Sequence, residues 1–252
     1  MPVTDALRFI TRPRFTEGRA RVDAEGLRHL LVLFLLTVLA VVVATGFVWP
    51  IILSATGGEM PSNANDALIN MNPARMVLIG MVVAPLVEEL IFRSWLGAPR
   101  ACLYGLPLLA GALVVTTAAG SGASGALVLP LAAVAGFLGV AVWARARALG
   151  PGAVSHARAA LFAWAFWGSA GLFALIHLAN FTDGITTPLL VLAVVPQLMV
   201  GLVLGYVRMR FGLAPAIGFH GAYNALFLTL ALLGSGLSGG AGDAAAALGA
   251  LF

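Results

Sequence analysis

Six polar side chains lie in stretches of the chain that are otherwise apolar, and their types are those of hydrolytic sites. They are Glu88, Glu89 and Arg93 in one stretch, His177 in a second, and His220 with Asn224 in a third. In a bilayer, a central charge costs at least about 2.5–3.5 kcal/mol, so such groups are expected to meet one another or to line a wet cavity. The sequence therefore predicts one shared polar site.

The spacing of these residues predicts how they divide the work. Glu89 and Arg93 are four residues apart, so on a helix they share a face and can form an ion pair. Glu88 is rotated by about 100° from Glu89 and need not join that pair. One carboxylate is therefore expected to be neutralised, which leaves the other free. His220 and Asn224 are also four residues apart and share a face.

This set of residue types suits hydrolysis by an activated water. With a histidine, Glu88 could hold and deprotonate a water molecule, while a neutral histidine and an asparagine amide could donate to an oxyanion. No serine or cysteine in the apolar stretches has comparably placed partners, so a covalent acyl-enzyme is not expected. Glu88, His177 and His220 would also make a catalytic zinc set, although the HExxH spacing is absent.

Composition indicates which elements must position these groups. Hydrophobic residues make up 61% of the 252 and charged residues 10%, and the mean hydropathy is +1.01. Soluble domains have about 45–50% apolar and about 25% charged residues, so lipid is expected to be the solvent for much of this chain. The net charge of +4 comes from arginines that cluster between the apolar stretches, with no lysine. That distribution favours membrane topology over nucleic-acid binding.

The fold class predicted is all-α, a polytopic bundle of about seven membrane spans. The spans are expected at about 27–53, 74–97, 101–119, 125–144, 159–181, 185–207 and 212–234. The Arg-rich segments fall on one side of such a bundle, and the loops or tail with Glu59, Asp183 and Asp243 fall on the other. The positive-inside rule then places the N-terminus in the cytoplasm.

Three segments follow along the chain. Residues 1–26 are predicted to be a cytoplasmic Arg-rich arm, 27–234 the transmembrane catalytic domain, and 235–252 a Gly/Ala-rich tail too short to span. The pair 101–119 and 125–144 is predicted to form either two spans or a re-entrant hairpin, with a tight Ser/Gly-rich turn between them. The single cysteine, Cys102, is expected to be a small buried hydrophobe.

Three motifs resemble those of a known family. Residues 88–93 read EExxxR, residues 173–177 read FxxxH, and residues 220–224 read HxxxN. In that order they resemble the CPBP family, the CAAX-protease and bacteriocin-processing (Abi-type) membrane proteins, which include the type II CAAX prenyl endopeptidase. Gln197, Gly201 and Gly205 resemble the run that precedes the last motif. The resemblance covers about residues 74–230, and it identifies 74–100 and 159–230 as the family-like core with 101–144 as an inserted hairpin.

The resemblance implies a role for each residue of the set. Glu88 would be the general base, and His177 would help to hold the water. His220 and Asn224 would form the oxyanion site, while Glu89 and Arg93 would support it. The resemblance implies no metal and no cofactor.

The function expected is that of a metal-independent intramembrane glutamic endopeptidase. The protein is expected to cross the lipid bilayer of a bacterial inner membrane several times. Its substrate would be a membrane-associated peptide or protein, and prenylated proteins are not expected if the host is bacterial. Bacteriocin maturation, peptide-signal processing and immunity stay open, as does the oligomeric state. The alternatives are a non-catalytic immunity or scaffold protein, a transporter or proton relay, and a zinc-dependent membrane hydrolase.

Overall fold

The computed structural model describes residues 2–16, 19–56, 73–120, 125–180 and 187–238, and every regular element in them is helical. The N-terminal half contains α1 (Pro2–Thr11), α2 (Ala24–Val43) with a π-helical continuation (Ala44–Val48), α3 (Trp49–Thr56), α5 (Pro73–Val77), a second π segment (Leu78–Val83), α6 (Ala84–Arg93) and 3-10 turns at Trp95–Gly97 and Ala101–Leu103. The rest contains α7 (Gly105–Gly120), α8 (Gly125–Ala148), α9 (Pro151–Ile176), a 3-10 turn (His177–Asn180), α10 (Thr187–Arg210) and α11 (Leu213–Ser238). The all-α prediction is confirmed.

Two stretches of the described chain have the length and apolar composition needed to cross a membrane. They are Ala24–Val48 and Pro151–Ile176. The first matches the predicted span at 27–53, and the second matches that at 159–181. Seven spans with a cytoplasmic N-terminus stay a prediction.

Several boundaries differ from those expected. α9 begins at Pro151 rather than near 159, because Gly150 caps a helix whose first turn accepts proline without losing a hydrogen bond. α7 begins at Gly105, since residues 101–103 form a separate 3-10 turn. α11 continues to Ser238, into the predicted tail.

Some of the segments predicted above fall where the structure gives no description. The loop portion with Glu59 and Asp66, the turn at 121–124, the loop with Asp183 and the tail portion with Asp243 lie outside the described residues.

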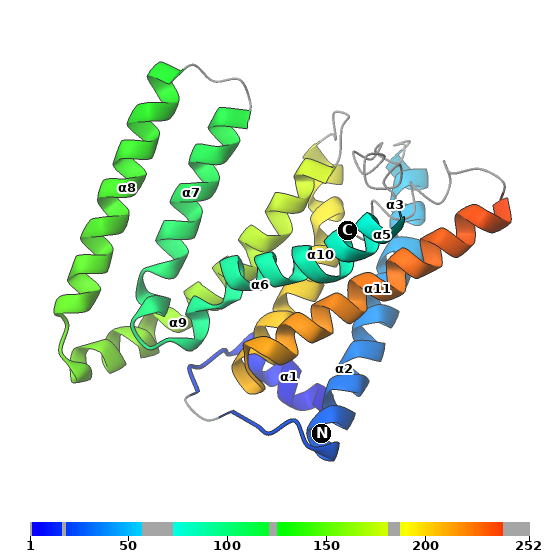
Figure 1. The fold of residues 1–252 in the computed structure, drawn as a ribbon, viewed down its shortest axis with the longest axis horizontal. Coiled ribbons are helices and arrows are strands. Elements are labelled where there is room, and N and C mark those ends of the chain that lie inside the picture. Colours follow the sequence, from blue (N-terminus) through cyan, green and yellow to red (C-terminus); the bar gives the residue numbers. More distant parts are fainter. Residues whose placement is uncertain (1, 17–18, 57–72, 121–124, 181–186, 239–252) are drawn as a thin grey trace.

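Helices α7 and α8 form an antiparallel pair at one edge of the molecule, beside α9 and clear of α2, α10 and α11 (Figure 1). Small residues allow their close approach, since a Cβ at Gly111 would lie 3.1 Å from the Cβ of Ala135. Arg100 fastens the lower end of α8 by donating to the carbonyl oxygens of Ala146 and Leu149, each at 2.9 Å. A hairpin is therefore present where one was predicted, and its status as an insertion stays a prediction.

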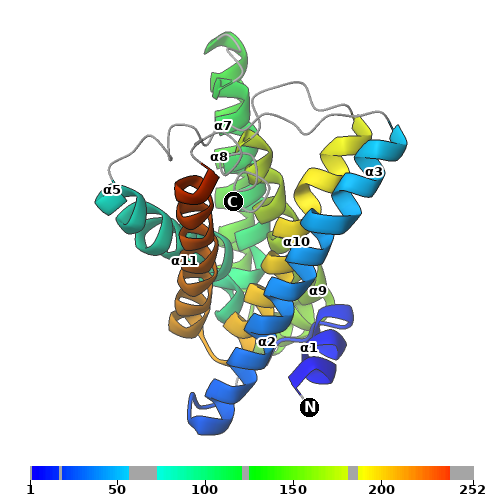
Figure 2. The same ribbon diagram turned by 90° about the vertical axis from the view of Figure 1, so that its right-hand side faces the viewer.

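The main apolar core lies where α2, α10 and α11 pack together, and Figure 2 shows α2 running alongside α10. Buried side chains such as Val41, Leu204 and Phe227 fill it. The predicted arm is not free of this core, because the ring of Phe9 in α1 makes edge contacts with Tyr206 and Phe166. These helices hold α6, α9 and α11 in fixed relation, and those three carry the predicted site.

Candidate active site

A buried carboxylate, guanidinium and imidazole form the centre of the site. Glu89 and Arg93, one turn apart on α6, have side chains 0% and 1% exposed and form the ion pair that their spacing predicted. From α11, Nδ1 of His220 lies 3.0 Å from Oε1 of the same glutamate. A carboxylate buried in this way requires compensation, and here two cationic or hydrogen-donating groups supply it.

Glu88 has a different environment from its neighbour. Its side chain is 23% exposed, and its nearest ionisable partner is His220, whose Nε2 lies 3.7 Å from Glu88 Oε2. That oxygen is itself buried and accepts no hydrogen bond from the described residues. The imidazole of His220 thus stands between two carboxylates, of which one is sealed and paired and the other can be reached.

The ring of Phe173 on α9 is the surface on which the other groups assemble. The guanidinium of Arg93 lies 4.1 Å from the ring centroid, and the rings of His177 and His220 lie 4.7 and 5.8 Å from it. A Cβ at Gly201 of α10 would lie 3.1 Å from the same ring, so the glycine allows α10 to approach. Contacts from α6, α9, α10 and α11 therefore converge at one aromatic side chain.

His177 lies at the C-terminal cap of α9, half-buried, and its ring orientation is set locally. Its Nδ1 lies 2.7 Å from the carbonyl oxygen of Phe173, one turn earlier. Because a carbonyl oxygen only accepts hydrogen bonds, Nδ1 must carry the hydrogen. In the neutral ring, Nε2 then has a lone pair and can accept a hydrogen bond from water.

Asn224 is held by a break in the helix that precedes Glu88. The Ala84 N–H donates to the carbonyl of Ile79, and Pro85 has no N–H, so the Gly80 carbonyl lacks its usual helical donors. The side-chain amide of Asn224 donates to that carbonyl at 2.8 Å. One of its two N–H groups is therefore used in joining α11 to the π segment, and one is left for a ligand.

Two polar residues that the sequence analysis did not select hold the end of α6. Ser169 donates to the carbonyl of Phe92 at 2.5 Å, and Arg208 donates to those of Arg93 and Ser94, each at 2.9 Å. Carbonyls at a helix C-terminus have no partners within the helix, so these bonds fix the turn that carries Arg93. Arg208 directly follows an apolar stretch in the sequence, and in the fold it is buried.

The described residues do not bring together three His, Cys, Asp or Glu side chains in a way that could hold a metal ion. Gln197, from the glycine-containing run, is buried on α10 one turn before Gly201. All six residues predicted for the site thus lie on α6, the end of α9 and α11. Ionic contacts within 4 Å join four of them: Glu88, Glu89, Arg93 and His220. His177 contacts the ring of Phe173, which also packs against His220, and Asn224 lies one turn beyond His220 on α11.

The described chain is thus an all-helical fold with a buried ionisable centre and two stretches that are long and apolar enough to cross a membrane. The chain belongs to the type II CAAX prenyl endopeptidase Rce1-like family, whose model matches residues 70–226, well over half of the chain. The family consists of membrane-embedded CAAX peptidases, and the resemblance drawn from the three motifs is confirmed. No curated protein and no solved structure matches the chain.

Proposed function

We propose that the protein is an intramembrane glutamic endopeptidase in which Glu88 activates the attacking water. The observation that carries this proposal is the contrast between adjacent carboxylates. Glu89 is fully buried and paired with Arg93, whereas the side chain of Glu88 is 23% exposed and its nearest ionisable group, His220, lies beyond hydrogen-bond distance. A general base must be able to reach its water, and of the two adjacent carboxylates only Glu88 is exposed enough to do so.

The reaction would proceed by direct attack of water on the peptide carbonyl. Nε2 of His177 accepts one hydrogen bond from the water and so orients it, while Glu88 removes the other proton as the oxygen bonds to the carbonyl carbon. The carbonyl oxygen becomes an oxyanion. When the C–N bond breaks, the proton held by Glu88 passes to the leaving nitrogen, and Glu88 is ready for another turn.

A neutral His220 would not serve as the oxyanion donor that the sequence led us to expect. Because Glu89 accepts from Nδ1, a neutral His220 would have only a lone pair at Nε2, and it could not donate to an oxyanion. Only a protonated His220 ring would carry a hydrogen on Nε2 as well as on Nδ1. Nε2–H of His220 is then a donor beside Glu88, and the second amide hydrogen of Asn224 completes the oxyanion site.

The proposed substrate is a peptide or protein segment at the membrane. The protein itself is proposed to be a multi-pass protein of a bacterial inner membrane. The family name refers to prenylated CAAX substrates. Whether this chain acts on such substrates is therefore part of the test, together with the metal independence of the mechanism.

The test is cleavage of a membrane-peptide library, prenylated and unprenylated, by purified protein reconstituted in lipid. Wild type, Glu88→Gln and a control, Glu25→Gln, are compared with and without a chelator, and products are identified by mass spectrometry. We expect cleavage by wild type and the control in chelator, and none by Glu88→Gln. Cleavage that survives Glu88→Gln would refute the proposal. Cleavage lost in chelator and restored by zinc would favour the zinc hydrolase instead.

A further inference from the structure

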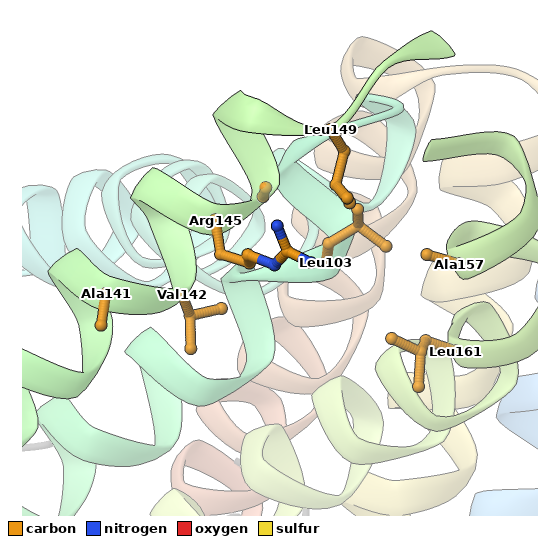
Figure 3. Close-up of a pocket in the computed structure, with 8 residues that line it drawn as sticks. Leu103, Ala141, Val142, Arg145, Leu149, Ala157 and Leu161 are labelled. Carbon is orange, nitrogen blue, oxygen red and sulfur yellow. The ribbon is translucent and has the colours of Figure 1, made fainter. Parts of the chain in front are cut away.

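An apolar cavity of about 340 Å³ lies away from the candidate active site, at the base of the α7–α8 hairpin. Its walls come from α8, from the start of α9 and from the 3-10 turn before α7, with Leu103, Val142, Leu149 and Leu161 among the lining residues. Figure 3 shows these side chains facing a common space. None of the six residues of the candidate active site lines it.

One cation lies in this otherwise apolar lining. The side chain of Arg145 extends from α8 toward Leu103 (Figure 3). Within the described residues it has no ion pair, and the sequence explains why: from residue 90 to residue 182 there is no aspartate or glutamate, whereas the same stretch contains five arginines. Arg145 is also exposed, so its guanidinium is open to an anionic ligand from outside the chain.

The other basic groups near the lower end of the hairpin have partners of their own. Arg100 donates to the carbonyls that end α8, Arg147 lies 5.7 Å from the ring centroid of Trp143, and Arg158 lies 4.1 Å from that of Phe15. Arg145 is distinguished from them by its position at the cavity.

An exposed apolar strip continues from the cavity along the hairpin. On α8, Leu138 and Val134 lie one and two turns before Val142 on the same face, and both are exposed. On α9, Trp164 follows Leu161 by one turn and is 69% exposed. At 1.5 Å per residue, the strip from Val134 to Arg145 is about 16 Å long, close to half of the roughly 30 Å hydrocarbon core.

We propose that this groove binds one anionic phospholipid, with its phosphate paired to Arg145 and an acyl chain along the strip. The length of the strip fits one leaflet, and the cation stands at the Arg-rich end where a headgroup would lie. Guanidinium groups bind phosphate oxygens in a bidentate manner, and basic pockets between membrane helices bind anionic headgroups. Charge complementarity thus selects an anionic lipid over a zwitterionic one.

The test measures lipids retained by the purified full chain in native mass spectrometry. Dioleoylphosphatidylglycerol and dioleoylphosphatidylcholine are added at equal concentration to wild type, Arg145→Gln and Arg147→Gln, the last being the matched control two residues along the same helix. Both lipids carry a phosphate and only phosphatidylcholine adds a cationic choline group, so wild type should prefer phosphatidylglycerol by about fivefold, the worth of one arginine beside an anionic lipid. Arg145→Gln should abolish this preference, and Arg147→Gln should keep it.

A second variant, Ala141→Phe, places a ring in the groove wall and should reduce retention of both lipids, with circular dichroism confirming its helix content. Equal retention of phosphatidylglycerol by wild type and Arg145→Gln overturns the proposal. So does an equal loss of preference in both arginine variants, which would indicate a diffuse basic surface, or unchanged retention in Ala141→Phe. The readout requires no peptidase activity, so the proposal stands or fails independently of the proposed function.

Discussion

Replacement of Arg93 by methionine should strongly destabilise the protein. Arg93→Met keeps an unbranched side chain of similar length but leaves the buried Glu89 with His220 alone. It also removes the cation from above the ring of Phe173. Breaking a buried ion pair by removing one partner costs about 3–5 kcal/mol, because the remaining charge is left uncompensated.

This cost can be measured as a shift in melting temperature. For chains of this size 1 kcal/mol corresponds to about 2–4 °C, so Arg93→Met should melt about 6–20 °C below wild type. The assay is thermal unfolding in lipid nanodiscs, followed by circular dichroism. Arg147→Met is the matched control on an exposed arginine, and it should stay within about 0.5 kcal/mol of wild type.

The double variant Glu89→Gln/Arg93→Met tests the reason for the loss. It removes the uncompensated charge, so it should recover about 0.5–3 kcal/mol relative to Arg93→Met. If the melting temperature of Arg93→Met equals that of the Arg147→Met control, the ion pair does not stabilise the fold. If the double variant melts no higher than Arg93→Met, the reasoning about an uncompensated carboxylate is wrong.

Three further changes test the supports of the site. Asn224→Asp replaces the amide that donates to the Gly80 carbonyl with a carboxylate that cannot donate. It should lower the melting temperature by an amount equivalent to about 1–3 kcal/mol, and Asn224→Ala should lower stability by no more than Asn224→Asp does. Gly201→Val should overpack the interface between α10 and α9, which should lower the free energy of unfolding by about 1–3 kcal/mol and reduce peptide cleavage. Gly218→Ala is the control, since a Cβ there meets nothing within 4 Å, and it should not reduce cleavage. Both variants are compared with wild type by peptide cleavage and thermal unfolding. Arg208→Lys keeps the charge but loses the two-carbonyl fork, so it should cost about 1.5–3 kcal/mol; a melting temperature equal to wild type would contradict the role assigned to it.

Local spacing predicted those parts of the site that depend on one helix. The Glu89–Arg93 pair follows from a separation of four residues, and so does the contact of His177 with the ring one turn before it. The motifs also predicted which stretches would meet. Each of these features needs only the helical period and the reluctance of charges to enter an apolar environment alone.

Other features depend on contacts that no sequence pattern encodes. The bond between Asn224 and Gly80 joins residues 144 positions apart, and it exists because Pro85 removes a donor from a different helix. Arg208 appears in the sequence as the flank of an apolar stretch, and its burial follows from the place where α6 happens to end. The hydrogen positions on His220 follow from its partner and could not be inferred from its spacing to Asn224.

The most direct test of the account is a single-turnover cleavage in H₂¹⁸O by wild type and by Glu88→Gln, with product and enzyme masses measured together. If Glu88 activates a water that attacks the peptide bond directly, ¹⁸O appears in the new carboxylate of the product and the mass of the enzyme does not change. Loss of the general base should also slow the step by about 10²–10⁴-fold. A product without ¹⁸O, ¹⁸O in the side chain of Glu88, an acylated enzyme, or a Glu88→Gln rate equal to wild type would contradict it.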